Sequence, residues 1–352
     1  MVATRARGSL WPVTCPPESV SRAMIWSLRW RRLLAAAVCC AMPNGVPAQG
    51  SAWQPQKPVE IVVGTSIGGG QDQSARFVQR LIQDRQLVGV PTAVVNKPGG
   101  GSSVGFAYLN QHKGDGHYIM LLTVPLVTNH ILGLSSIAPS DLSPIAVLFE
   151  EYIVATVVPD SPIKSGRDLL ERLKKDPSSV TVGVPSLTGG GNFAILMAAK
   201  AAGVDPKRVK TVVFKSGGDS MTALLGGHID VMMSTTGAPL IQFKQGKVRI
   251  VAVAAPNRLP GLLVEVPTWT EQGARVVFSN WRAIVGPQGL SRPQLQYWET
   301  VFEKLVKEPQ FQEDLARNMW VENFKRGDEM RSFLKEEYDE VKALLTELGM
   351  AK

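Results

Sequence analysis

Short apolar runs recur along the chain from residue 59 onward, and most consist of β-branched residues with few polar interruptions. Such runs are typical of strands that are buried on both faces of a sheet. The pattern predicts eight strands, at residues 59–63, 92–95, 118–122, 152–158, 180–184, 211–214, 229–233 and 249–254.

Helical periodicity appears between several of these runs. Ala75, Val78 and Ile82 follow the i, i+3, i+7 spacing of one helix face, and leucines cluster between residues 169 and 173 after a polar lead. Alternating strands and helices predict an α/β fold with open, mostly parallel sheets flanked by helices. From residue 291 onward we see no strand pattern and expect two or three helices, one with Tyr338 and Val341 on its buried face.

About 300 residues follow the first fifty, which suggests two lobes. We expect lobe 1 at residues 53–155 plus 280–352 and lobe 2 at residues 156–279. Two crossing strands would join them, one near 152–158 and one near 276–285.

The first fifty residues have the order of a secretory signal. A basic stretch at residues 22–32 precedes an apolar run at 33–42, and Val46-Pro47-Ala48 fits a small-residue cleavage site. We therefore expect residues 1–48 to be a signal peptide, a mature chain starting at Gln49 and a periplasmic protein. Met24 is the expected true start, and a long signal or a disordered leader is the alternative.

The cysteines and much of the excess positive charge lie before the expected cleavage site. Cys15, Cys39 and Cys40 all precede the expected cleavage site, so the mature chain has neither a disulfide nor a thiol nucleophile. Lipidation of Cys39 is the alternative to cleavage near residue 48. The leader holds six arginines and one glutamate, which leaves 32 basic and 29 acidic side chains out of 38 and 30. This balance does not indicate a nucleic-acid partner.

Four glycine clusters stand between an expected strand and an expected helix: residues 68–72, 99–103, 189–192 and 216–219. Glycine allows close approach of a ligand and positive φ, which we expect at Gly69 and Gly70. A helix N-terminus offers free N–H groups to an anion such as a carboxylate. Any single cluster can instead be a tight turn or a helix cap. Together they predict a polar cleft at the strand ends.

Nucleotide-binding and metal-binding motifs are missing from the sequence. There is no phosphate-binding loop with a Gly-Lys-Ser/Thr ending, and the four histidines lack metal spacing. A serine–histidine–aspartate site stays open, although nothing points to one. We therefore expect neither an enzyme nor a bound cofactor.

Ordered blocks along the chain resemble the extracytoplasmic receptors of tripartite tricarboxylate transporters, the Bug-type binding proteins. The most specific blocks are KPVEIVV, GGGQD, VVNKPGGGSSVG, GDGHYIMLLT, LKKDPSSVTVGVPS, TALLGGHIDV and VPTWTEQG. LKKDPSSV and TALLGGHI resemble the citrate-type branch especially. The resemblance implies a two-lobed periplasmic binding protein that closes on a small organic acid, with di- and tricarboxylates favoured. It also implies delivery to membrane permease subunits, and we expect a monomer.

The resemblance also implies a set of ligand-binding residues. In the family, the loop after the first strand grips one carboxylate with help from the loop near residues 186–192, a hydroxyl ends a strand in the cleft, and a glycine loop of the distal lobe completes the site. The corresponding residues here are Ile67, Gly68, Gly69, Gly70, Asp72, Thr123, Ser186, Gly190, Asn192, Ser216 and Gly217.

Two positions depart from the family's pattern. Many relatives carry an acid near Ser234 that pairs with the amine of amino-acid ligands, and a serine makes an amino-acid ligand less favoured. Asn192 replaces a frequent histidine, which puts its contact in doubt.

A further carboxylate on the ligand would need a cation. Arg282 is the first candidate, because a guanidinium pairs bidentately with carboxylates, and Lys215 is the second. Arg282 can alternatively face solvent or an internal acid. Two other functions stay open: a ligand sensor that signals to a membrane protein, and a periplasmic enzyme on the same fold.

Overall fold

The structure is a computed structural model that describes residues 52–351. The expectations about the leader, its three cysteines and its cleavage concern residues outside this range. Within it, no helix is both long and apolar enough to cross a membrane.

Ten strands form the described sheet. In chain order they are β1 (Val59–Val63), β2 (Thr92–Asn96), β3 (Tyr118–Leu122), β4 (Ser143–Val157), β5 (Val182–Val184), β6 (Thr211–Val213), β7 (Val231–Thr235), β8 (Arg249–Val253), β9 (Ser279–Gly286) and β10 (Val321–Arg326).

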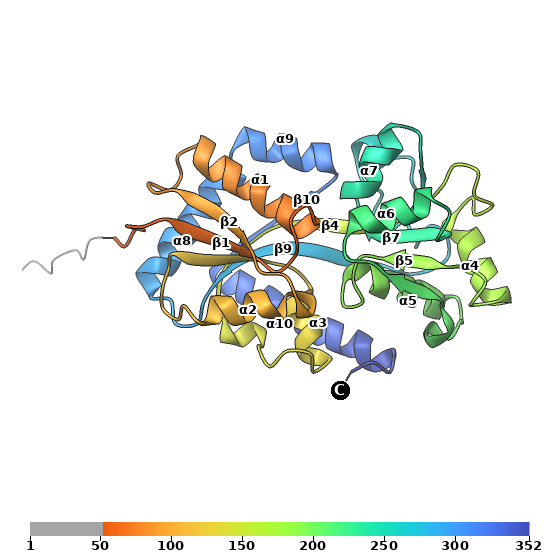
Figure 1. The fold of residues 1–352 in the computed structure, drawn as a ribbon, viewed down its shortest axis with the longest axis horizontal. Helices are drawn as coiled ribbons and strands as arrows, with labels where there is room; N and C mark the ends of the chain where they lie inside the picture. Colours follow the sequence, from red (N-terminus) through yellow and green to blue (C-terminus); the bar gives the residue numbers. More distant parts are fainter. Residues whose placement is uncertain (1–51, 352) are drawn as a thin grey trace, which may run out of the picture. The chain divides into compact units, whose positions relative to one another are not determined.

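The strands form two groups that share β4. The first group has the order β2-β1-β3-β9-β4, and the second continues as β4-β7-β5-β6. Up to Tyr152, β4 pairs with β9, and β10 pairs with it at residues 146–150. From Ile153 onward β4 pairs with β7, and from Val154 with β8. Figure 1 shows β4 and β9 near the middle of the molecule, between the outer strands of the two groups.

Both parallel and antiparallel pairings occur. Strands β2, β1 and β3 are parallel to one another, as are β6, β5 and β7. The pairs that include β4 or β9 are antiparallel. The predicted α/β architecture is confirmed, with parallel strands on the outside of each group and antiparallel strands where the groups meet.

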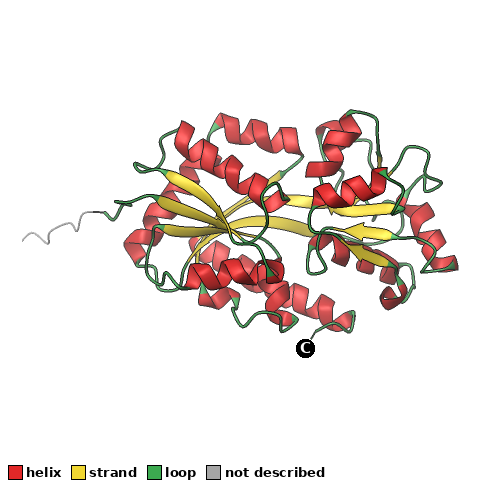
Figure 2. Cartoon of the chain, in the orientation of Figure 1, coloured by secondary structure: helices red, strands yellow, loops and turns green. Residues whose placement is uncertain are grey.

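Helices cover both faces of the sheet (Figure 2). Above it in Figure 1 lie α1 (Gly70–Asp84), α6 (Gly217–Leu225), α7 (Gly237–Lys244) and α9 (Pro309–Asn318). Below it lie α2 (Ser103–Asn110), α3 (Pro125–Ile131), α5 (Gly190–Ala201) and α10 (Gly327–Glu347), and α4 (Gly166–Lys175) packs beside α5 at the right-hand end. Helix α8 (Arg292–Val306) packs on β4, and four 3₁₀ turns complete the list: η1 (Gly100–Ser102), η2 (Pro139–Asp141), η3 (Pro206–Arg208) and η4 (Gly261–Leu263).

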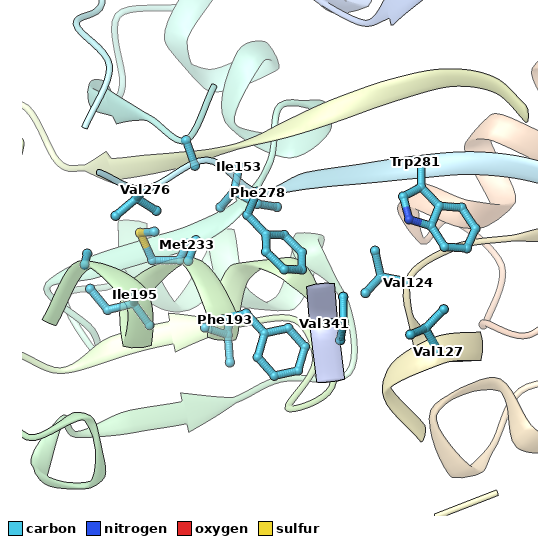
Figure 3. Packing of buried hydrophobic residues seen from close by; sticks show 14 of the residues in the cluster. Val124, Val127, Ile153, Phe193, Ile195, Met233, Val276, Phe278, Trp281 and Val341 are labelled. Carbon is cyan, nitrogen blue, oxygen red and sulfur yellow. The ribbon is translucent and has the colours of Figure 1, made fainter. Parts of the chain in front are cut away.

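The largest apolar cluster extends beneath both groups of strands. Figure 3 shows Val124 and Trp281 from the first group in the same cluster as Phe193 and Met233 from the second. Each of these four side chains is fully buried. The core thus continues across the junction of the two groups and fixes the loops that end the strands.

The prediction of an all-helical C-terminal stretch is wrong. Residues 321–326 form β10, which runs antiparallel to β4. Its sequence, Val-Glu-Asn-Phe-Lys-Arg, does not alternate regularly between apolar and polar residues. Most of its residues are half-exposed, as they can be in an edge strand. The apolar-run criterion therefore misses it.

Candidate functional site

A cavity of about 640 Å³ lies where the strands end. Residues that directly follow β1, β3, β5 and β6 line it, together with the end of β7. Carboxyl ends of parallel strands are the usual place for a ligand in open α/β sheets. The volume is within the range of about 300–1,000 Å³ that small-molecule sites occupy.

Helix N-termini converge on this cavity. The first residues of α1, α5, α6 and α7 are glycines that line it, namely Gly70, Gly190, Gly217 and Gly237. The N-cap residues of α1 and α5 are also glycines, which provide no side-chain acceptor for the first-turn N–H groups. In contrast, Ser165 caps α4, outside the cavity, by accepting from Asp168 N at 3.0 Å. The uncapped N-termini favour a bound anion.

The lining residues include two basic side chains, Lys215 and Arg282, and no aspartate or glutamate. Because the helix dipoles add partial positive charge at the same place, the electrostatics of the cavity suit an anionic ligand. Within residues 52–351 no group of three metal-ligating side chains occurs.

Most of the residues predicted from the sequence lie together around the cavity. Those that line it are Gly68, Gly69, Gly70, Thr123, Ser186, Gly190, Ser216, Gly217, Ser234 and Arg282.

Three predicted residues lie outside the lining. Ile67 is 76% exposed. Asp72 is buried and accepts from Gly68 N at 2.8 Å, so it shapes the loop before α1. Asn192 donates from Nδ2 to Leu187 O at 2.9 Å and likewise fixes its own loop.

The Asp72 carboxylate is held ionised. Burial opposes ionisation, but hydrogen bonds from Arg76, from Gly68 N–H and from Asn96 outweigh it and lower the pKa of Asp72. Arg76 Nε lies 2.9 Å from the carboxylate, so the negative charge is neutralised at the base of the loop. The α1 N-terminus is therefore left free of a competing charge.

Positive φ occurs at a different glycine from the one expected. Gly69 has φ −69° and Gly70 also lacks positive φ, whereas Gly68 has φ +82°. The expectation of positive φ at Gly69 and Gly70 is wrong because both residues already form the ordinary start of a helix. In the turn that precedes the helix, Gly68 is the residue that needs positive φ.

Arg282 is paired inside the protein. Its Nη2 lies 2.8 Å from Glu151 Oε2, and the two side chains are 2% and 3% exposed. Its Nε donates to Ser74 Oγ at 3.0 Å and its Nη1 to Asn280 O at 3.2 Å. Burial raises the pKa of Glu151 and lowers the pKa of Arg282, while the attraction between them opposes both changes.

Two serine hydroxyls of the site already form hydrogen bonds within the protein. Ser216 Oγ caps α6 by accepting from Asp219 N at 3.1 Å. Ser234 Oγ donates to the carbonyl of Thr235 at 3.0 Å. These contacts orient the ends of β6 and β7 at the cavity.

The sequence analysis placed the glycine cluster at 99–103 at the cleft but named no ligand-binding residue in it. Residues 99–102 line the cavity, and all four have positive φ, including Ser102 at +85°. Asn129 Nδ2 holds this loop by donating to Gly101 O at 2.7 Å. Asn129 was missed, because it lies in the middle of a helix and no sequence pattern marks it.

Three buried acceptor atoms around the cavity have no hydrogen-bond partner among the described residues: Thr65 Oγ1, Gln71 Oε1 and Asn129 Oδ1. Gln71 and Asn129 are oriented by their own amide donors, which bond to backbone carbonyls. Unsatisfied buried polar atoms are uncommon and mark places where water or a ligand completes the hydrogen bonding.

Comparisons with known proteins agree with this geometry. The family model described as "Tripartite tricarboxylate transporter family receptor" matches residues 75–350. A Cupriavidus necator protein, the UPF0065 protein in the gbd 5′ region, is 28% identical over 325 residues, which cover 91% of this chain and 96% of the relative.

Two solved structures share the fold. The periplasmic binding protein BugD superimposes with a TM-score of 0.76 at 24% identity and covers 85% of this chain and 99% of its own. Rpa4515 of R. palustris, solved with adipate, superimposes with a TM-score of 0.78 at 20% identity and covers 84% and 99%. The family match extends over most of the described residues, and the cavity lies at the strand ends of a two-lobed binding-protein fold. This chain therefore belongs to the tripartite tricarboxylate transporter family receptors.

Proposed function

We propose that this protein captures a small organic carboxylate in the cavity and delivers it to the membrane subunits of a tripartite tricarboxylate transporter. The observation that carries the proposal is the set of helix N-termini around a cavity whose lining contains no acidic side chain. Three of these N-termini, those of α1, α5 and α7, lack any side-chain cap. Membership of the receptor family supports delivery to a transporter.

A carboxylate fits the available donors. The loop before α1 and the loop before α5 both present backbone N–H groups with glycine N-caps, so two loops can share one carboxylate. The adipate bound to Rpa4515 is a dicarboxylate, which supports the same ligand class here. An amino-acid ligand is less suited, because no carboxylate lines the cavity to pair with its ammonium group.

The experiment is a thermal-shift screen of the purified protein against mono-, di- and tricarboxylates, amino acids and neutral sugars. A ligand at 100 times its Kd stabilises the folded state by about 2.7 kcal/mol, which raises Tm measurably. We expect carboxylates to raise Tm and neutral sugars to leave it unchanged. A response to sugars and none to any acid would contradict the proposal.

We propose further that the chain folds as two lobes, residues 53–155 plus 280–352 and residues 156–279, which close on the ligand. The change of partners of β4 between Tyr152 and Ile153 supports a hinge there. Small-angle scattering tests this proposal: the radius of gyration should fall when a saturating carboxylate is added. An unchanged radius with bound ligand would argue for a rigid cleft.

Periplasmic delivery requires export, which we propose occurs by cleavage of a signal peptide near Ala48. Mass spectrometry of the protein from the periplasm should give an N-terminus within a few residues of Gln49. A retained Met1 or a lipid on Cys39 would contradict this proposal.

A further inference from the structure

The charge of the cavity comes from two basic side chains that differ in their surroundings. Arg282 is almost fully buried and is matched by the equally buried Glu151 at 2.8 Å. The pair therefore contributes little net charge to a ligand. Its contact with Ser74 holds the second turn of α1 against β9, and its contact with the Asn280 carbonyl lies within β9.

Lys215 is the other basic residue of the lining, and it is exposed. It follows β6 and precedes the N-terminus of α6. Within residues 52–351 it forms no ion pair and no side-chain hydrogen bond, while many surface lysines do, such as Lys57 with Asp115 and Lys174 with Glu171. Its ammonium group is thus available to an anion in the cavity.

Apolar side chains line the cavity beside the polar ones. Ile153 lies on β4, Leu187 on the loop before α5 and Phe214 directly before Lys215, and all three line the cavity. Apolar lining favours contact with hydrocarbon rather than with a second set of polar groups. The arrangement suits a carbon skeleton that carries an acid at each end.

We propose that Lys215 binds a second carboxylate of the ligand and so selects dicarboxylates over monocarboxylates of the same length. The Arg282–Glu151 pair instead positions the α1 N-terminus for the first carboxylate. This inference rests on the proposed carboxylate-binding function. It assigns the role of distal cation to Lys215 because that lysine alone, of the two basic lining residues, has no carboxylate partner among the described residues.

The test is titration calorimetry with three matched pairs of acids: succinate with butyrate, adipate with hexanoate, and phthalate with benzoate. The full protein is compared with Lys215→Met and with Lys210→Met. Lys210 is an exposed lysine just before the same strand that does not line the cavity, so its variant has the same change in net charge. Unliganded Tm is measured for both variants to confirm that folding is unaffected.

We expect Lys215→Met to weaken the best dicarboxylate about ten- to hundredfold and its monocarboxylate partner less than about twofold, since a charge-assisted bond is lost only with the former. Lys210→Met should change neither affinity. Raising the salt concentration should narrow the preference of the unaltered protein for the dicarboxylate, because the lysine is exposed.

An equal loss of both members of a pair, or no loss in Lys215→Met, overturns the role of Lys215 and leaves the proposed function standing. Failure of the unaltered protein to bind any of the six acids overturns the role of Lys215, and the proposed function falls with it only if the tricarboxylates of the thermal-shift screen fail as well. Retained dicarboxylate preference in Lys215→Arg, together with its loss in Lys215→Met, supports a requirement for positive charge at this position.

Discussion

Glu151 Oε2 lies 2.8 Å from Arg282 Nη2, with both side chains buried and on adjacent strands β4 and β9. Ser74 of α1 completes the group by accepting from Arg282 Nε at 3.0 Å. The pair lies one residue before the point at which β4 exchanges β9 for β7. It therefore joins the two central strands and the helix whose N-terminus faces the cavity.

Replacement of Glu151 by Gln should lower the free energy of unfolding by about 3–5 kcal/mol, because it leaves the buried guanidinium without a counter-charge. Urea unfolding measures the change. Glu171→Gln is the control, since Glu171 is 55% exposed and its pair with Lys174 contributes about 0–1 kcal/mol. Similar costs for the two variants would show that the buried pair has no special role in stability.

The half-buried Glu337 predicts a stability change with pH. Burial raises the pKa of its carboxyl to about 7, the hydrogen bond from Trp281 Nε1 opposes this rise, and nearby Glu340, Glu150 and Glu336 reinforce it. The folded state thus binds the proton more tightly than the unfolded state, where the pKa is 4.5.

Stability from Glu337 is therefore complete below pH 4.5 and is lost as the pH rises to about 7. We expect this carboxyl to contribute a decrease of about 2–3 kcal/mol in the free energy of unfolding across that interval. Glu337→Gln should remove this part of the decrease, whereas Glu329→Gln, an exposed position on the same helix that does not contribute to the shift, should keep it. Urea unfolding at pH 4.5, 6 and 7.5 provides the comparison, and parallel profiles for the unaltered protein and Glu337→Gln would contradict the assignment.

Gly70→Val should weaken carboxylate binding more than it weakens the fold. A Cβ at Gly70 would lie 3.6 Å from Arg282 Nη2 and 3.8 Å from Thr235 Oγ1, which are ordinary contacts, so the backbone can accept it. The branched side chain would nevertheless occupy the wall of the cavity next to the α1 N-terminus. We expect at least a tenfold loss of affinity by calorimetry and a small change in Tm.

The matched control is Gly89→Val, because an added Cβ at Gly89 meets no atom within 4 Å. It should leave affinity unchanged. If Gly70→Val instead lowers Tm sharply and binds normally when folded, the glycine is needed for the turn and not for the ligand.

Gly191 is a packing requirement of α5. An added Cβ would lie 2.2 Å from the backbone oxygen of Met233 on β7, and a backbone atom cannot move aside as a side chain can. Gly191→Ala should cost about 1–3 kcal/mol or more of unfolding free energy, as overpacking does.

Gly218→Ala serves as its comparison in the first turn of α6. There the nearest atom is Ser216 Oγ at 3.6 Å, so alanine fits and should be neutral or slightly stabilising. Chemical denaturation of both variants distinguishes steric exclusion from general helix propensity. A stable Gly191→Ala variant would show that α5 can shift away from β7.

The sequence allowed good prediction wherever structure follows from local pattern. The apolar runs at 59–63 and 118–122 match β1 and β3 residue for residue, because both strands are almost fully buried. The first half of β4 was missed, since Glu150 and Glu151 interrupt its apolar run. Glu151 is compatible with a buried strand only through Arg282, a partner far along the chain that local reasoning does not identify.

In the candidate site too, features set by local sequence were predicted and features set by distant partners were not. Glycines at the starts of helices were predicted to gather at one edge, and they line one cavity, because parallel strands bring their carboxyl ends together. The partners of charged side chains were not predictable. The sequence analysis ranked Arg282 before Lys215 as the distal cation, and only the fold shows that Arg282 has a buried carboxylate beside it.

The pairing of β3 with β9 places Met120 opposite Val285. The first group of strands therefore cannot be completed during synthesis until β9 has been made. Before then, the edge of β3 that pairs with β9 has no partner strand. Contacts between such distant residues raise the contact order and slow folding. A chain that ends before β9 would expose the edges of β3 and the first half of β4, and such open edges pair readily with other molecules. Loss of the C-terminal fifth should thus produce aggregation rather than a smaller folded protein.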